Sequence, residues 1–325
     1  MIKVENLVKS FGAKHAVDDI SFSVERGEVL GFLGPNGAGK STTMRVITGF
    51  YPPTSGRVTI GGFDIDEDPL PAKRLMGYLP ENAPGYADMT VHGFLGFAAD
   101  LRGLRGDAKK NAVHKAVETC FLDSVLYQTI DTLSKGYKHR TCLAQAIIHD
   151  PPILVLDEPT DGLDPNQKHE VRGLIKRMGE QKAIVFSTHI LEEVEAACTR
   201  VIIIDRGKIV ASGTPQELKA RSEFAGVVRF ATRSASAATL KEKLAPLAAR
   251  SEVVRDAGGA VVMRAYPRER GSNGAFVGSI AELARRENWQ LDEIHVEEGR
   301  LDEVFRAITL PDTVVAPPEQ VAGVH

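Results

Sequence analysis

The chain has 325 residues, of which 43% are hydrophobic, and this size favours one large domain followed by a smaller one. Its 40 basic and 43 acidic residues give a formal net charge of −3 at pH 7, so no overall cationic field attracts nucleic acid or anionic lipid. Its apolar runs are shorter than the roughly 18 residues of a membrane span, and its charged start predicts no signal peptide. We therefore expect a cytoplasmic protein with no nucleic-acid partner, in which Cys120, Cys142 and Cys198 are reduced core residues.

Apolar spacing predicts a mixed α/β core in residues 1–222. Residues 28–33 form an apolar run typical of a strand buried on both faces, and residues 41–49 have helical spacing. A glycine-rich turn separates the two, as a phosphate-binding loop requires. Between about 82 and 140, helical patterns dominate and predict an inserted helical subdomain. Further strands are predicted at 2–7, 16–24, 153–156, 183–186 and 201–204, and their alternation with helices favours a largely parallel sheet.

From residue 226 a second rhythm of strands and helices begins. The order β-α-β-β-α-β predicts a small α+β domain of ferredoxin-like type over 226–310. Its last helix, 301–308, carries an apolar stripe at i, i+3, i+4 and i+7. This region could instead cover apolar surface on the core or form a flexible regulatory extension. The tail, 311–325, has three prolines and no amphipathic period, so we expect it to be disordered.

An eight-residue stretch that begins at Gly34 fits the pattern G-x-x-x-x-G-K-[ST]. Its glycines permit a tight turn that points backbone N–H groups at phosphate oxygens, and the following helix adds its positive end. Lys40 is expected to reach the β- and γ-phosphates of a nucleotide, and Ser41 to bind Mg²⁺. The alternative is an ordinary glycine-rich loop. The expected nucleotide-binding residues are those of this stretch and the residue after it: Gly34, Pro35, Asn36, Gly37, Ala38, Gly39, Lys40, Ser41 and Thr42.

Two adjacent acidic residues follow a predicted buried strand. Residues 153–156 are all apolar, and Asp157 and Glu158 come directly after them. A phosphate-binding loop requires a carboxylate for its metal ion, and Asp157 is the expected Mg²⁺ ligand. Glu158 is then placed to take a proton from an attacking water. The alternative for Glu158 is a solvated residue of a turn.

Residues 133–137 read LSKGY, and with the motifs above in this order the chain resembles the ABC ATPase family, whose common signature is LSGGQ. Ser134 and Gly136 are retained, whereas Lys135 and Tyr137 resemble variants in bacterial exporter ATPases. The resemblance covers about residues 1–222. It implies that Ser134 and Gly136 contact the γ-phosphate of ATP held by a second subunit. From the residues alone, Ser134 is also a good N-cap for the next helix, and the two roles are compatible.

The resemblance assigns roles to four further residues. Asp164, in a Gly-Leu-Asp segment, looks like the D-loop residue that crosses the dimer interface. His189 looks like the histidine that contacts the γ-phosphate, although a lone histidine is more often structural. Phe11 stands where the family has an aromatic ring that stacks on adenine, and its alternative is packing near the first strands. Glu81 replaces the glutamine of the family's Q-loop; it can still bind Mg²⁺, and its alternative is a solvated side chain.

The resemblance therefore implies a subunit that binds MgATP and hydrolyses ATP, with Glu158 as base and His189 as sensor of the γ-phosphate. Two such subunits would form a homodimer or a heterodimer around two nucleotides and would drive a separate transmembrane permease subunit. That permease would bind in the groove beside Glu81 and the segment 86–97. The expected location is the cytoplasmic face of the inner (plasma) membrane, reached through the permease.

Residues 299–305, GRLDEVF, look like the closing helix of exporter-branch subunits, including drug-resistance and gliding-motility types. The main rival function is a soluble ABC ATPase that acts on nucleic acid or ribosomes without a membrane partner. The single module and the acidic net charge argue against this rival. A second rival is a regulatory module that binds nucleotide without turnover, and the presence of both Asp157 and Glu158 argues against it.

Overall fold

The computed structural model describes residues 1–82, 85–269 and 273–309, so the disorder expected for 311–325 lies outside the described residues. Contacts divide the chain into two compact units, Met1–Pro215 and Gln216–Ile308. Each unit has its own apolar core. Within the described residues, no helix has both the length and the apolar composition that a bilayer span requires.

Two sheets form the first unit. One is a four-stranded antiparallel sheet in the order β2-β1-β4-β5, and the other has six strands in the order β10-β9-β3-β8-β7-β6. In the second sheet all neighbours are parallel except β9 and β10. This arrangement confirms the mixed α/β core. The strands are β1 (Ile2–Phe11), β2 (Lys14–Val24), β3 (Val29–Leu33), β4 (Ser55–Ile60), β5 (Phe63–Asp64), β6 (Met76–Leu79), β7 (Ile153–Asp157), β8 (Ala183–Thr188), β9 (Arg200–Asp205) and β10 (Lys208–Gly213).

The central strands β3, β7 and β8 are buried at every residue. In β7, Ile153 and Val155 belong to one apolar cluster, whereas Leu154 and Leu156 belong to a second cluster. Both faces of the sheet are therefore covered, and a strand in this position needs apolar side chains at every step rather than at alternate ones. Because the three strands are parallel neighbours, their carboxyl ends meet at one edge of the sheet.

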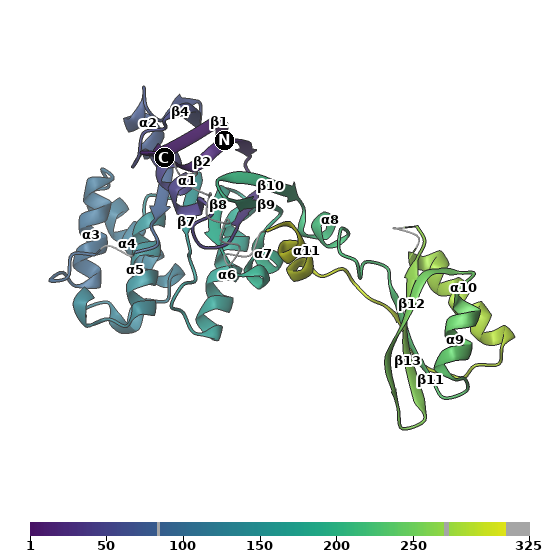
Figure 1. The fold of residues 1–325 in the computed structure, drawn as a ribbon. Helices are drawn as coiled ribbons and strands as arrows, with labels where there is room; N and C mark the ends of the chain where they lie inside the picture. The colour runs from purple at the N-terminus through teal and green to yellow at the C-terminus, as the bar shows by residue number, and fades with distance from the viewer. Residues whose placement is uncertain (83–84, 270–272, 310–325) are drawn as a thin grey trace, which may run out of the picture. The chain divides into compact units, whose positions relative to one another are not determined.

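The helices of the first unit follow the strands. In Figure 1, α3, α4 and α5 lie together as a helical group. This group contains most of the helical region expected at 82–140. Its first helix, α3, begins after Thr90, whose side chain accepts a hydrogen bond from Gly93 N at 3.1 Å. The helices are α1 (Lys40–Ile47), α2 (Pro69–Arg74), α3 (Val91–Leu101), α4 (Gly106–Thr119), α5 (Lys135–Ile147), α6 (Pro165–Gly179) and α7 (Leu191–Ala197), with 3₁₀ turns at Asp123–Val125 and Ile130–Thr132.

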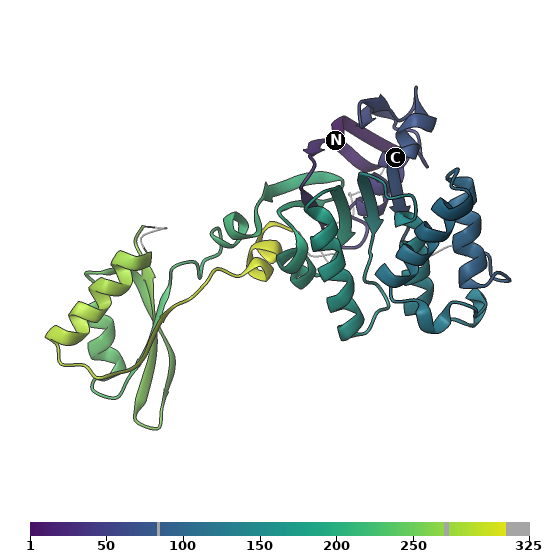
Figure 2. The ribbon, with the colours of Figure 1, turned by 180° about the vertical axis from the view of Figure 1, so that it is seen from behind.

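The second unit contains one antiparallel sheet in the order β12-β13-β11-β14. The helices over residues 237–244 and 273–286 lie on one face of that sheet (Figure 2). The elements are α8 (Pro215–Lys219, which begins at the end of the first unit), β11 (Val228–Thr232), α9 (Ala237–Leu244), β12 (Ala248–Ala257), β13 (Ala260–Pro267), α10 (Asn273–Arg286), β14 (Leu291–Val296) and α11 (Leu301–Ile308). From β11 to β14 the order is β-α-β-β-α-β. The ferredoxin-like assignment of this unit stays a prediction.

The core of the second unit yields a stability prediction. Phe230 is fully buried and stacks on Trp289, with ring centroids 6.5 Å apart and planes 9° apart. We expect Phe230→Ala to lower the free energy of unfolding of this unit by about 3–5 kcal/mol, because it removes apolar contact and leaves a cavity. Trp289 is the single tryptophan, so its fluorescence during urea unfolding reports on this unit. The control is Val254→Ala, at a residue 41% exposed, which should change stability by less than about 1 kcal/mol. Equal midpoints for the two variants would contradict the prediction.

Candidate functional site

The glycine-rich loop leaves β3 at the carboxyl edge of the sheet and leads into α1. Two of its glycines are required by close backbone contacts. A Cβ on Gly34 would lie 2.4 Å from Ile204 O, and one on Gly39 would lie 2.5 Å from Ala16 O. Gly39 also has a φ of 109°, a backbone conformation that residues with a side chain rarely adopt. The loop therefore passes tightly between neighbouring segments, and its backbone N–H groups stay at the start of α1.

Lys40 is the first residue of α1, and its ammonium group lies across the loop. Nζ donates to Gly34 O at 2.9 Å and to Pro35 O at 3.2 Å, and it lies 3.7 Å from Glu158 Oε1. Burial lowers the pKa of this ammonium, while the neighbouring carboxylates of Glu158 and Asp157 act in the opposite direction. A cation in this position favours an anion in the loop.

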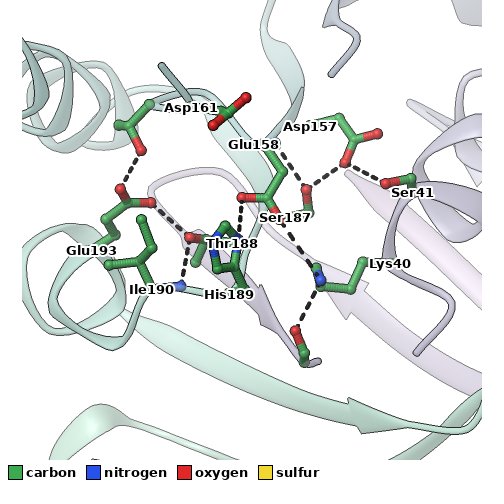
Figure 3. A network of polar contacts seen from close by, with 12 residues as sticks. Lys40, Ser41, Asp157, Glu158, Asp161, Ser187, Thr188, His189, Ile190 and Glu193 are labelled. Atoms are coloured by element: carbon green, nitrogen blue, oxygen red, sulfur yellow. Dashed lines mark hydrogen bonds and ion pairs between the residues drawn. The ribbon is translucent and has the colours of Figure 1, made fainter. Parts of the chain in front are cut away.

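Asp157 ends β7 and joins three elements through one carboxylate oxygen (Figure 3). Its Oδ1 accepts from Ser41 Oγ at 3.1 Å and from Ser187 Oγ at 2.5 Å. Its Oδ2 is buried and has no hydrogen-bond partner within the part of the chain that the structure describes. Burial raises the pKa of this carboxyl group, and the two serine hydroxyls oppose that shift. A buried carboxylate oxygen with spare acceptor capacity, beside a hydroxyl, fits the oxygen ligands that Mg²⁺ prefers.

Glu158 has a positive φ of 50°, which is uncommon for a residue with a side chain. Its N–H donates to Ser187 O at 3.2 Å and to Ser187 Oγ at 3.0 Å, and these bonds hold the turn. Its Oε2 lies 3.0 Å from His189 Nδ1 (Figure 3). Burial raises the pKa of the Glu158 carboxyl group, whereas His189 and Lys40 act to lower it. A carboxylate with a raised pKa, held by a histidine, is suited to accept a proton from water.

A cavity of about 430 Å³ lies in front of the loop. Phe11 lines the cavity and is 47% exposed. Its ring lies 5.4 Å from that of Tyr51, so the residue both packs near the first strands and has exposed surface at the cavity. Glu81 is exposed and lines the same cavity. Lys14 and Ala16 also line it, although no motif marks them in the sequence. The full lining is Phe11, Lys14, Ala16, Asn36, Gly37, Gly39, Lys40, Ser41, Thr42, Glu81 and Glu158.

The residues expected to act on a second subunit's nucleotide do not line this cavity among the described residues. Ser134 is exposed at the start of α5 and accepts from Tyr137 N at 3.4 Å, so it is an N-cap. Gly136 is buried against the Gln167 side chain. Asp164 caps α6 by accepting from Gln167 N at 2.9 Å. Lys135, in the signature segment, forms a 2.7 Å ion pair with Asp161.

Four buried residues of the hydrogen-bond network around Asp157 and Glu158 have no predicted role: Thr160, Ser187, Thr188 and Glu193. Glu193 Oε1 accepts from Thr160 Oγ1, and its Oε2 accepts from Thr188 Oγ1 at 2.7 Å. Ser187 and Thr188 directly precede His189 in the chain, and this adjacency was the available signal for them. Nothing in the local sequence marks Glu193.

The family described as "ABC transporter" matches residues 17–161. The linearmycin resistance ATP-binding protein LnrL of Bacillus subtilis (strain 168) is 39% identical over 223 residues, which are 68% of this chain and 71% of that protein. The Nod factor export ATP-binding protein I of Paraburkholderia xenovorans (strain LB400) is 35% identical over 256 residues, or 78% and 83% of the two chains. The probable multidrug ABC transporter ATP-binding protein YbhF of Escherichia coli (strain K12) is 40% identical over 223 residues, but these cover 38% of its length.

Solved structures agree with these matches. A structure described as the ATP-binding subunit of an ABC transporter has a TM-score of 0.63 at 30% identity and covers 67% of this chain and 92% of that one. A dimeric bacterial ABC transporter cassette shares the fold, with a TM-score of 0.62 at 23% identity over 66% of this chain and 99% of its own. With the loop, the carboxylate pair and these relatives together, the chain belongs to the ABC transporter family as an ATP-binding subunit with ATPase activity.

Proposed function

We propose that this subunit hydrolyses MgATP as a dimer and drives a transmembrane permease subunit that exports its cargo. The observation that carries the proposal is the convergence of Lys40, Asp157, Glu158 and His189 at the carboxyl edge of the sheet, where Lys40 and Glu158 also line a cavity of about 430 Å³. Ligands of α/β sheets bind at this edge. The volume is in the range of small-molecule sites.

The phosphates of ATP would lie in the glycine-rich loop, on the N–H groups that precede α1 and beside Lys40. Ser41, Asp157 and Glu81 would hold Mg²⁺, which when bound neutralises charge on the phosphate oxygens. Asn36, Ala38 and Thr42 belong to the same loop and helix start, and Phe11 would stack on the adenine ring. This binding mode accounts for the presence of the glycine-rich loop and of Lys14 and Lys40 at one cavity.

Glu158 would take a proton from the water that attacks the γ-phosphate, and His189 would contact that phosphate. The 3.0 Å contact between their side chains supports this pairing, because it orients the carboxylate and leaves Oε1 facing Lys40. The backbone strain at Glu158 is also typical of residues held for a reaction.

Ser134 and Gly136 would complete the site of a second subunit, and Asp164 would lie at the interface between them. In support, Ser134 is exposed at the N-terminus of a 13-residue helix, where a hydroxyl and free N–H groups favour an anion. A head-to-tail pair then buries two nucleotides in one twofold interface. The pair would be a homodimer or a heterodimer.

The permease would bind beside the Q-loop segment. A groove of about 670 Å³ is lined by Tyr78, Pro80 and Asn82, on either side of Glu81, together with Arg45, Phe50, Tyr51, Arg102 and Gln145. Phe50 is 67% exposed there, and exposed aromatic rings are typical of interfaces. A second aromatic group nearby in sequence joins Tyr86 to Phe97 at 5.6 Å. The subunit would then work at the cytoplasmic face of the membrane, and the names of its resistance and export relatives support an exporter.

Residues 226–310 would form a separate accessory domain that stabilises the dimer or the complex with the permease. In support, every motif of the nucleotide site lies before Ser222, and the second unit has its own core. Leu301 and Val304 of α11 are buried.

The role of Glu158 as the base leads to a prediction for ATP turnover. We expect Glu158→Gln to lower the ATPase rate by at least about 100-fold, because the amide cannot accept the proton of water. ATP affinity, measured with a fluorescent analogue, should change by less than about threefold, since the phosphate loop is unaltered. ATP should then hold the dimer together long enough to be seen by light scattering. A variant with the wild-type rate would exclude Glu158 as the base.

The second prediction concerns the signature segment. In the Glu158→Gln background, Ser134→Arg should abolish ATP-dependent dimerisation while the monomer still binds ATP, because Ser134 faces only the other subunit's nucleotide. The change also removes a helix cap worth about 1 kcal/mol, so the melting temperature is measured in parallel. His114→Arg, at an exposed position on α4, is the control and should leave the dimer fraction unchanged. Equal dimer fractions for both variants would remove Ser134 from the interface.

The third prediction concerns the second unit. Truncation after Ser222 should leave ATP affinity and the basal ATPase rate within about threefold of wild type, because no residue of the proposed site is removed. Dimer formation, or co-purification with the permease, should weaken. Loss of ATP binding by a folded truncated chain would contradict a purely accessory domain.

A further inference from the structure

A buried carboxylate lies beneath the proposed active site and outside its motifs. Glu193, in α7, is 1% exposed. Within the part of the chain that the structure describes, its carboxylate oxygens accept hydrogen bonds from two hydroxyl groups and form no ion pair. Burial of an ionised carboxylate without a cation is costly unless its oxygens are hydrogen-bonded. A glutamate in this position is therefore expected to have a specific role in the structure or the reaction.

The two hydroxyls come from the two segments that carry the proposed catalytic pair. Thr160 lies two residues after Glu158, and its Oγ1 donates to Glu193 Oε1. Thr188 directly precedes His189, and its Oγ1 donates to Glu193 Oε2 at 2.7 Å. The same Thr188 oxygen accepts from Ile190 N at 3.0 Å, so the turn after β8 is also fixed. One carboxylate thus joins the loop after β7 to the end of β8.

Other contacts hold these segments less directly. Ser187 fixes the backbone of Glu158, but not the loop that continues through Thr160. That loop is also held by the ion pair between Lys135 and Asp161, whose side chains are 66% and 44% exposed. An exposed ion pair contributes little, because solvent screens it and the long side chains lose freedom. Of these two contacts of the loop after Glu158, the hydrogen bond from Thr160 to Glu193 is buried, whereas the ion pair is exposed to solvent.

We infer that Glu193 is a positioning residue for ATP hydrolysis, which holds Thr160 and Thr188 at a fixed separation and so keeps Glu158 and His189 in contact. The inference rests on the proposed function of Glu158 and His189. Glu193 does not line the nucleotide cavity, so it acts through the two threonines. Loss of its bonds should affect the rate of hydrolysis and leave ATP binding in place.

The test compares variants of Glu193 in the full-length chain, with kcat, KM, ATP affinity and melting temperature measured for each. Glu193→Ala should lower kcat at least about tenfold, with KM and ATP affinity within about threefold of wild type. Glu193→Gln should stay within about threefold in kcat, because its amide can accept from one threonine and donate to the other. Glu192→Ala is the matched control, since Glu192 is the preceding residue of the same helix and is exposed. It should leave all four quantities unchanged.

A second pair of variants keeps the test decisive if Glu193→Ala does not fold. Thr160→Val keeps the shape of the side chain and removes the hydroxyl, whereas Thr160→Ser keeps the hydroxyl. Thr160→Val should lower kcat by about threefold or more at constant KM, and Thr160→Ser should remain near wild type. A purely structural role would lower the melting temperature without this split between kcat and KM.

Three results would overturn the inference: an unchanged kcat in Glu193→Ala, a rise in KM alone, or equal rates for the two Thr160 variants. Its failure is distinguishable from failure of the proposed function. If Glu158→Gln blocks turnover while Glu193→Ala retains kcat, only the positioning role is wrong. If Glu158→Gln itself retains turnover, the proposed base is wrong, whatever the Glu193 variants do.

Discussion

The hydroxyl of Ser187 is the contact on which the arrangement of the nucleotide site depends. It donates to Asp157 Oδ1 at 2.5 Å and accepts from Glu158 N at 3.0 Å, while Ser41 donates to the same Asp157 oxygen at 3.1 Å. The serine is fully buried, so water cannot replace these bonds. They join the ends of β7 and β8 to the start of α1. These bonds therefore fix β7, β8 and α1 relative to one another. The phosphate loop is fixed with them, because it leads directly into α1.

The same hydrogen bonds place the carboxylates of Asp157 and Glu158 in different environments. Asp157 stays in line with β7 and bonds to hydroxyls, whereas the positive φ of Glu158 turns its side chain toward Lys40 and His189. Burial raises the pKa of both carboxyl groups and lowers that of Lys40, so each charged form depends on its neighbours. Two adjacent acids can thus be suited to different tasks, one to hold a metal ion and the other to accept a proton.

The sequence predicts the parts of this arrangement that depend on local spacing. The apolar run of β7 and the glycine pattern after β3 define the parallel core, and the structure brings Lys40, Asp157 and Glu158 together as that pattern requires. Thr160 and Glu193 escape prediction because 33 residues separate them, and a hydrogen bond between such common residue types leaves no sequence pattern. In the second unit, β12 runs for ten residues although large apolar residues, Val253 and Val254, mark only its middle, because cross-strand pairing with β13 extends it.

The loop that follows Glu158 makes specific contacts at both of its ends. At one end Thr160 bonds to Glu193, near the proposed base, and at the other Asp164 caps α6. Between them Gly162 has a φ of 71°, and a Cβ there would lie 2.4 Å from Lys135 Cδ. The glycine is therefore required by its backbone conformation, whereas the exposed Lys135 side chain is free to shift. In the proposed dimer, Ser134 next to that lysine faces the other subunit's nucleotide, so this one loop contacts elements of two active sites. In that dimer, a displacement of the loop at one active site would also displace residues of the other active site.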